Sequence, residues 1–236
     1  MRRPAVRWIR NRRRRWLRER RALGLERPLP LAVLEVNCMS ISAGPARAKA
    51  ILERAAEVDV HGHRVDYILG CEADDFDAAT VLGSGWDVHH DQTHPDKDGS
   101  FQAIRKTRGR LRDAHAVHAS APLPGVLPAR WLSVAHVDVD METPRRWSFN
   151  GGSGHAPPMR AWARWPQYMG SARAARLDVL GADFNKLAGA VLAALGRRVS
   201  AIHILAVATR WWIPTSRPVA IDVGGDHLAV GIVLLP

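Results

Sequence analysis

Seven polar residues in this chain stand at or just beyond the ends of short apolar runs. They are Asn37, Glu72, His136, Asp183, Asn185, Asp226 and His227. Strand ends that open into loops are the places where a rigid sheet carries reactive groups. The three carboxylates form a hard-oxygen set that suits Mg²⁺, with Mn²⁺ as the alternative. The amides and imidazoles add hydrogen-bonding groups for phosphate oxygens. This combination predicts metal-assisted hydrolysis of a phosphate ester, which needs a Lewis acid, an activated water and stabilisation of developing charge.

The elements that must position these groups alternate between strand and helix patterns. Short apolar or alternating runs predict strands over residues 31–36, 65–71, 100–106, 131–137, 177–182, 201–208, 217–222 and 228–235. Apolar residues at helical spacing predict helices over residues 46–58, about 159–173, and 186–198. Two polar or Gly/Pro-rich stretches, residues 89–99 and 143–158, are predicted to be loops. Many strands with interspersed helices indicate a layered α/β sandwich.

The order of these motifs resembles the endonuclease/exonuclease/phosphatase superfamily, which includes deoxyribonuclease I-like and abasic-site nucleases. The matching segments are LEVNCMS, VDYILGCEA, DGSFQAIRKTRG, WLSVAHV, ARWPQYM, LDVLGADFNKL and VGGDHLAV, spread over about residues 31–236. The resemblance implies a four-layer α/β sandwich, with two packed mixed β-sheets flanked by helices. It also implies a Mg²⁺-dependent phosphoesterase, either an endonuclease or an exonuclease, or a phosphatase.

The resemblance implies a metal site and a catalytic group. Glu72 and Asp226 would bind the metal, and Asn37 would belong to the same site, hydrogen-bonded beside Glu72. Taken alone, Asp226 and His227 after two glycines also fit a hairpin turn.

Four residues would do the chemistry. Asp183 would position or deprotonate the attacking water, and Asn185 would hold a phosphate oxygen. His136 and His227 would flank the scissile phosphate. Taken alone, Asp183 and Asn185 also fit a turn that caps the next helix, and His136 fits a core histidine. The joint order of the motifs favours the catalytic interpretation.

The sequence departs from the family pattern at two places. Ala182 stands where the family usually has glycine. Ile202, just before His203, occupies the slot of an aspartate that orients the terminal histidine, and Asp222 is a candidate substitute. Loss of an orienting carboxylate can cost orders of magnitude in rate. Arg164 and Gln167, which match an Arg-x-x-Gln helix of the family, are expected to be structural.

The basic charge of the chain is concentrated at its N-terminus. Residues 1–27 contain twelve arginines and two glutamates, and so carry +10 of the formal net charge of +11. We therefore divide the chain into an Arg-rich arm, residues 1–28, which can be helical, and a catalytic domain, residues 29–236. Such a block attracts nucleic acid through counterion release. Its expected contacts are Arg12, Arg13, Arg14, Arg15 and the stacking ring of Trp16. A solvated tail, or translation annotated from too early a start codon, remains the alternative.

Other features exclude some classes of protein. No apolar run is long enough to span a bilayer, and no secretory signal is present, so a cytoplasmic location is expected. Two cysteines, Cys38 and Cys71, do not make a disulfide scaffold and are expected to be free. Five histidines match no structural zinc spacing and are expected in solvent-exposed loops: His61, His63, His89, His90 and His94. Trp211 and Trp212 form a candidate platform for substrate.

Three functions fit this sequence. The first is a Mg²⁺-dependent nuclease that acts on DNA, because the arm supplies affinity for a polyanion. The second is a phosphatase or phosphodiesterase of small molecules or lipid headgroups. The third is a nucleic-acid-binding relative in which Ile202 has disabled catalysis.

Overall fold

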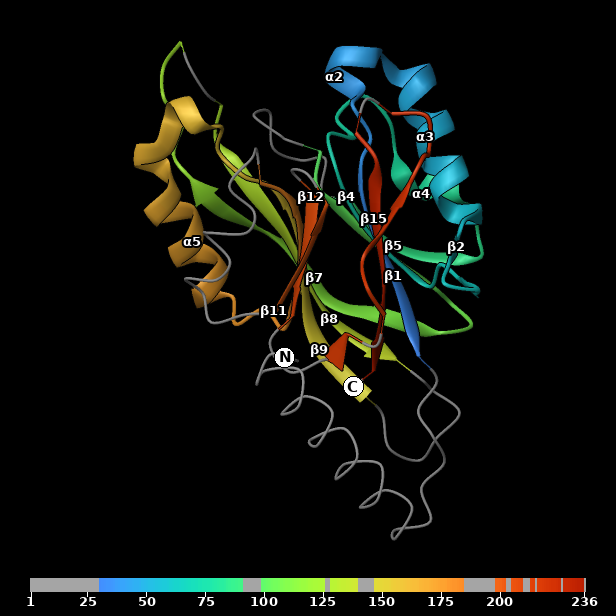
Figure 1. Ribbon diagram of the computed structural model, residues 1–236. Helices are drawn as coiled ribbons and strands as arrows, with labels where there is room; N and C mark the ends of the chain where they lie inside the picture. Colours follow the sequence, from blue (N-terminus) through green and yellow to red (C-terminus); the bar gives the residue numbers. More distant parts are fainter. Residues whose placement is uncertain are drawn as a thin grey trace, which may run out of the picture.

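Two mixed β-sheets pack face to face at the centre of the computed structural model (Figure 1). The structure describes residues 30–90, 99–125, 128–139, 147–184, 198–202, 205–209, 213–214, 216–225 and 227–235. The Arg-rich arm and nearly all of the predicted helix over residues 186–198 lie outside these ranges. The two sheets belong to the predicted catalytic domain.

The first sheet contains seven strands. Its order is β13 (Ile213–Pro214), β15 (Ala229–Leu235), β1 (Leu31–Asn37), β4 (Tyr67–Cys71), β6 (Phe101–Arg105) and β5 (Trp86–His90), with β14 (Val219–Ile221) also paired to β15. Among these described strands only β1 and β4 run parallel, with Asn37 opposite Cys71. Every residue of both strands is buried, as expected for strands covered on both faces.

The second sheet contains six strands. Its order is β11 (Arg198–Ile202), β12 (Leu205–Thr209), β10 (Val179–Asp183), β9 (Trp147–His155), β8 (Arg130–Val139) and β7 (Gly109–Ser120). Here β9 and β10 form the parallel pair within the described strands, with His155 opposite Asp183. Each sheet therefore holds one parallel pair, and each pair has a polar residue at or just after its carboxyl ends.

Helices cover the outer faces of both sheets (Figure 1). The first sheet carries α2 (Ser40–Ala43), α3 (Pro45–Glu57) and α4 (Ala78–Leu82), and the second carries η1 (Met159–Arg164) and α5 (Trp165–Ala174). Buried apolar side chains fill the three interfaces between these layers. Ile51 of α3 packs against the first sheet, Tyr67 and Phe149 pack between the two sheets, and Tyr168 of α5 packs against the second sheet. The predicted four-layer α/β sandwich is confirmed. A small hairpin of β2 (Asp59–Val60) and β3 (His63–Arg64) completes the described elements.

Three sequence predictions of local structure are wrong. Residues 147–155, predicted as part of a loop, form strand β9, because its glycines allow close packing rather than turns. A Cβ on Gly151 would overlap the Tyr67 hydroxyl of the facing sheet. Residues 201–208, predicted as one strand, are shared between β11 and β12, which pair antiparallel. His89 and His90 lie half-buried in β5 rather than in an exposed loop.

Candidate functional site

Two of the predicted site residues lie at the carboxyl ends of β1 and β4, the parallel pair of the first sheet. Asn37 is the last residue of β1, and Glu72 directly follows the last residue of β4. Glu72 has φ of 53°, in the left-handed region that non-glycine residues rarely adopt. Backbone strain of this kind persists where the surrounding structure enforces it, often at functional sites.

The other residues of the site lie at the carboxyl ends of β9 and β10, the parallel pair of the second sheet. His155 is the last residue of β9 and Asp183 is the last residue of β10. The backbone N–H of Ala156 donates to the Asp183 carbonyl at 2.9 Å, which holds the two strand ends together. Both side chains are buried, with His155 9% and Asp183 2% exposed.

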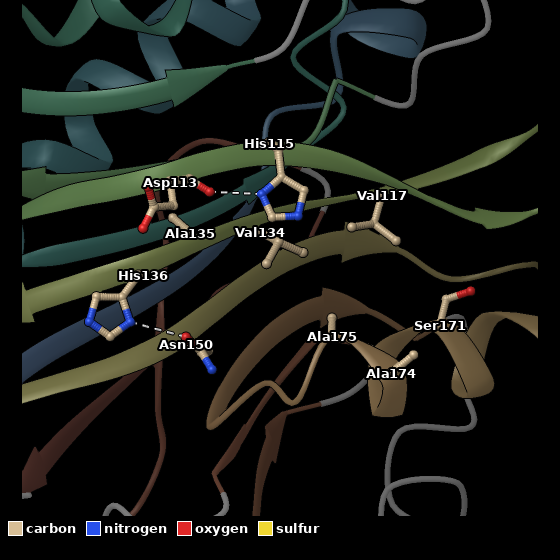
Figure 2. A pocket seen from close by; sticks show the side chains of 10 residues that line it. All are labelled: Asp113, His115, Val117, Val134, Ala135, His136, Asn150, Ser171, Ala174 and Ala175. Atoms are coloured by element: carbon tan, nitrogen blue, oxygen red, sulfur yellow. Dashed lines mark hydrogen bonds between the residues drawn. The ribbon is translucent and has the colours of Figure 1, made fainter.

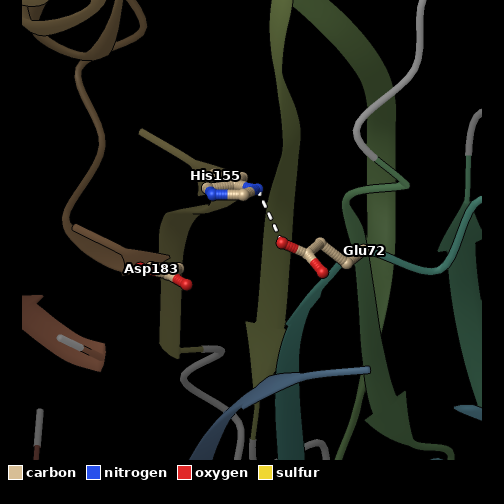
Figure 3. A group of neighbouring side chains, drawn as sticks. All are labelled: Glu72, His155 and Asp183. Atoms are coloured by element: carbon tan, nitrogen blue, oxygen red, sulfur yellow. Dashed lines mark ion pairs between the residues drawn. The ribbon is translucent and has the colours of Figure 1, made fainter. Parts of the chain in front are cut away.

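The two halves meet across the gap between the sheets. Asn37 Nδ2 donates to Asp183 Oδ2 at 3.1 Å, and Asn37 Oδ1 accepts from the Met39 backbone at 2.8 Å. Ligand atoms of Glu72, His155 and Asp183 all lie within 4.8 Å of one another (Figure 3). Among the described residues this is the one group of three or more acidic, cysteine or histidine side chains close enough to hold one metal ion.

A buried arginine completes the site. Arg130 is the first residue of β8 and is 7% exposed. Its Nη1 lies 3.3 Å from Nδ1 of His155. Burial raises the pKa of Glu72, and the guanidinium charge of Arg130 opposes that rise. Arg130 therefore places one fixed positive charge beside His155 and Glu72.

Burial shifts the titration of both groups that face Arg130. Burial raises the pKa of Glu72, and the charge of Asp183 adds to this, whereas the hydrogen bond from Asn37 and the charge of Arg130 oppose it. Burial lowers the pKa of His155 to about 3, and the charges of Arg130 and His227 act in the same direction. His155 is therefore a neutral imidazole at neutral pH.

The contact between His155 and Glu72 fits a site for a cation. Nδ1 of His155 and Oε1 of Glu72 lie 3.2 Å apart (dashed line in Figure 3). Because Arg130 can only donate, Nδ1 accepts its hydrogen bond and carries a lone pair. A carboxylate oxygen and a lone pair at this distance repel each other, and the positive charge of Arg130 offsets part of that repulsion. Glu72 and Asp183 thus fit a bound divalent metal, with the imidazole of His155 beside them.

Four of the seven predicted residues lie at or near this site. Asn37, Glu72 and Asp183 converge directly. His227 is half-buried, and its charge acts on the pKa of His155, which places it nearby. Asn185 and Asp226 lie outside the described residues, as do Arg12, Arg13, Arg14, Arg15, Trp16, Trp211 and Trp212.

His136 does not join the site, so its predicted position is wrong. In the register of β8 it lies opposite Asn150, five residues before His155 on β9, which is about 16 Å along the strand. Its side chain shares a face with Val134, which packs in the cluster under α5, so it points away from the space between the sheets. Nδ1 of His136 lies 3.2 Å from Asn150 Oδ1, in an open pocket of about 610 Å³ on the outer face (Figure 2).

Sequence reasoning missed His155 and Arg130. His155 was not predicted because three glycines within residues 150–155 suggested a loop. The signal that identifies it is its place directly before the segment that carries Arg164 and Gln167. Arg164 donates to the Pro122 carbonyl at 3.0 Å and Gln167 accepts from the Ala121 backbone at 3.1 Å, which fits the structural role predicted for both.

Three further predictions concern residues around the site. Ile202 ends β11, but its side chain and His203 lie outside the described part of the chain. Asp222 accepts a hydrogen bond from the Gly224 backbone at 2.8 Å, so it shapes the Gly-Gly turn. Cys38 and Cys71 are free and buried, and burial raises the pKa of both thiols.

Two wider predictions can be compared with the described residues. None of the predicted loop histidines that the structure describes belongs to the three-residue cluster, and His94 lies outside. In the described residues, every helix is too short or too polar to cross a membrane.

Comparison with known proteins identifies the fold. No family model and no curated protein sequence matches the chain. The human Nocturnin catalytic domain with bound sulfate matches with a TM-score of 0.58 and 13% identity, over 88% of this chain and 93% of that chain. D. rerio TDP2, complexed with single-strand DNA product, matches with a TM-score of 0.59 and 11% identity, over 88% and 99%. ANGEL2, a 2′,3′-cyclic phosphatase, matches with a TM-score of 0.51 and 13% identity, over 69% and 54%.

These three proteins share one architecture. Each has the two packed mixed sheets of the deoxyribonuclease I-like fold. The order of motifs in the sequence, the pairing of the strands and these structural likenesses agree. The chain therefore has the deoxyribonuclease I-like fold.

Proposed function

We propose that this protein is a metal-dependent phosphodiester hydrolase that cleaves nucleic acid, with DNA as its substrate. The observation that carries the proposal is the meeting of Glu72, His155 and Asp183 at one edge of the sandwich. These side chains come from three strand ends in two different sheets. Burial of two carboxylates beside a neutral imidazole is costly, and a divalent cation offsets that cost.

The donor set fits a hard cation. Glu72 and Asp183 supply carboxylate oxygens, which Mg²⁺ and Mn²⁺ prefer, and the predicted ligand Asp226 would add a third. When bound, such a cation supplies Lewis-acid polarisation of a phosphate oxygen. Glu72 is the residue we assign first to the metal, because its pKa is raised by burial and by Asp183, so that a cation would favour its ionised form.

Asp183 is the residue we assign to the attacking water. A general base must be ionised and held in a fixed position. The amide of Asn37 fixes Oδ2 of Asp183, and the backbone of Met39 in turn fixes Asn37. The carboxylate of Asp183 would orient the water and accept its proton. Asn185, two residues further, is expected to hold a phosphate oxygen.

His155 and Arg130 would bind the scissile phosphate and stabilise the negative charge that develops on it during the reaction. Since Nδ1 of His155 accepts from Arg130, the ring proton of the neutral imidazole resides on Nε2. His155 would thus act as a hydrogen-bond donor to a phosphate oxygen rather than as a protonated acid. Arg130 adds a permanent positive charge at the same place. His227 is the remaining candidate for protonating the leaving oxygen.

Nucleic acid is the substrate class that the charge distribution favours. The arm would add non-specific affinity for a polyanion through Arg12, Arg13, Arg14 and Arg15, with Trp16 stacking on a base. A small phosphoester needs no such tether. The likeness to a TDP2 structure that holds a single-strand DNA product supports the same class.

The test is cleavage of supercoiled plasmid and of a single-stranded oligonucleotide by the full chain. We expect nicking with Mg²⁺ or Mn²⁺ and none with a chelator. Asp183→Asn and Glu72→Gln should each remove the activity. Asp59→Asn, an exposed aspartate on the β2–β3 hairpin, is the matched control and should cleave normally. Cleavage that survives Asp183→Asn would refute the assignment.

A second candidate is a phosphatase of small phosphoesters, supported by the likeness to ANGEL2. It predicts turnover of a cyclic or terminal phosphate without cleavage of plasmid or oligonucleotide. The third function, a binding protein without activity, predicts DNA binding but no turnover of either substrate. Side-by-side assays of the three outcomes separate these functions.

A further inference from the structure

We propose that Trp162 is the surface on which a nucleobase near the scissile phosphate stacks. The inference rests on the proposed function and adds a base-binding subsite to it. The Trp162 side chain, on η1, is 71% exposed. In the described ranges the other large apolar side chain that is clearly exposed is Leu228, at 48%. An exposed indole lacks the stabilisation that burial of its large apolar area would give. Such exposure is useful where the ring binds a ligand.

Both exposed apolar residues follow a site residue closely along the chain. Leu228 directly follows His227, whose charge acts on His155. Trp162 follows His155 by seven residues, and Ala156 between them is hydrogen-bonded to Asp183. From Ala156 the chain runs three residues to η1 and then three more within a 3₁₀ helix. That path spans at most about 16 Å, a distance that a few nucleotides cover.

The segment that carries Trp162 is fixed at its far end. Arg164 Nη2 donates to the Pro122 carbonyl at 3.0 Å, and the Ala121 backbone donates to Gln167 at 3.1 Å. Residues 121–122 follow β7, and the same connection leads to Arg130 at the start of β8. The contacts therefore tie η1 to the chain that supplies the buried arginine of the site. A ring presented on a fixed segment loses little entropy when a ligand stacks on it.

The charge around Trp162 favours a nucleic acid strand over other partners. Residues 156–177 contain four arginines and no aspartate or glutamate. An exposed aromatic ring in an arginine-rich segment without acidic residues is the combination expected to bind single-stranded nucleic acid, in which bases stack on rings while arginines follow the phosphates. The proposed phosphodiester site, whose Asp183 carbonyl accepts from the Ala156 backbone, would supply the point at which the strand is anchored. The ligand is thus the base of a single-stranded segment.

The test measures binding by the full chain with Asp183→Asn, so that the substrate is not consumed. Fluorescence anisotropy would follow a labelled single-stranded oligonucleotide and one of equal length whose residues are abasic. Trp162→Ala should raise the Kd for the normal oligonucleotide about 5- to 100-fold. Trp162→Phe should keep most of the affinity, whereas Trp162→Leu should resemble alanine. On the abasic oligonucleotide all four proteins should agree within about twofold.

The outcomes that overturn the inference are distinct from failure of the proposed function. An unchanged Kd for Trp162→Ala, or an equal loss on both oligonucleotides, rules out base stacking even if the protein cleaves DNA. A steeper or flatter salt dependence in Trp162→Ala would also contradict it, since a neutral ring releases no counterions. If the unsubstituted chain binds neither oligonucleotide, the proposed substrate class fails, and this inference fails with it. The side chain is exposed, so loss of folding is not expected.

Discussion

The imidazoles of His155 and His136 differ in the faces to which they point. Side chains alternate along a strand, so residues an even number apart share a face. His155 shares its face with Ser153, whose hydroxyl donates to the Gly70 carbonyl of the other sheet at 2.7 Å. His136 shares its face with Val134 under α5. The sequence predicts a strand at His136 but a loop at His155. The facing direction also depends on which strands pair, and local pattern does not contain that information.

This contrast predicts different effects of two alanine substitutions. His155→Ala should lower kcat/KM for an oligonucleotide by at least about 100-fold, because it removes a donor to the phosphate. His136→Ala, a change of the same size on the outer face, should stay within about twofold. Steady-state kinetics with thermal unfolding of both proteins checks this. Comparable losses in both variants would mean that His155 is not part of the active site.

Glu35 gives a prediction about pH. This residue lies on β1, is fully buried, and has an elevated pKa because of burial first and the charge of Asp183 second. A carboxyl whose pKa is higher in the folded protein binds more protons there than in the unfolded chain. The protein therefore loses stability as the pH rises from the pKa of glutamate in the unfolded chain, about 4.3, through the higher pKa of Glu35 in the folded protein.

Glu35→Gln should remove this loss. The variant should unfold at the same temperature as the natural chain near pH 4, and at a higher temperature at neutral and alkaline pH. Thermal unfolding with a chelator present, measured from pH 4 to 9, gives the comparison. The control is Glu57→Gln at the end of α3, which makes the same change at an exposed position outside the core. Parallel profiles of Glu35→Gln and the natural chain would contradict the prediction.

At the scale of elements, the fully buried strands were predictable and the unusual ones were not. Strands β1, β4 and β10 are short apolar runs because sheet or helix covers both of their faces. Strand β9 carries glycines where the opposite sheet and α5 approach closely, so it lacks a β-strand composition. Strand β7 lies at an edge of its sheet and mixes apolar and charged residues, and no strand was predicted there from the sequence.

The close packing of β9 predicts opposite effects of two glycine substitutions. Gly151→Ala should destabilise the protein by about 1–3 kcal/mol, because its Cβ would overlap Tyr67 and approach Gln102 Oε1 at 2.7 Å. Gly170→Ala, on exposed α5 backbone with no atom within 4 Å of the added carbon, should stabilise it by about 0.5–1 kcal/mol. Urea unfolding measures both. A neutral Gly151→Ala would mean that β9 packs more loosely than the structure shows.

At the scale of the whole molecule, the site exists because two parallel pairs end at the same edge. The sequence predicted Asn37, Glu72 and Asp183 as strand-end residues, and their order in the chain indicated the fold. It did not indicate that β1 and β10 face each other, since that follows from the packing of the sheets. The hydrogen bond between Asn37 and Asp183 joins residues 146 positions apart. Such pairs depend on the packed core between the sheets.

The Arg-rich arm gives a prediction for the whole chain. Arg12, Arg13, Arg14 and Arg15 stand in a run within a segment of +10 charge, while the rest of the chain is nearly neutral. If each arginine neutralises one phosphate of a single strand, replacing all four by glutamine should flatten the slope of log K against log salt by about 3, at about 0.7 per phosphate. Replacing all four by lysine keeps the charge and should keep the slope. Anisotropy titrations from low to physiological salt, in the Asp183→Asn chain, measure both. An identical slope after the glutamine substitutions would show that the arm does not bind the strand, and affinity would then have to come from the catalytic domain alone.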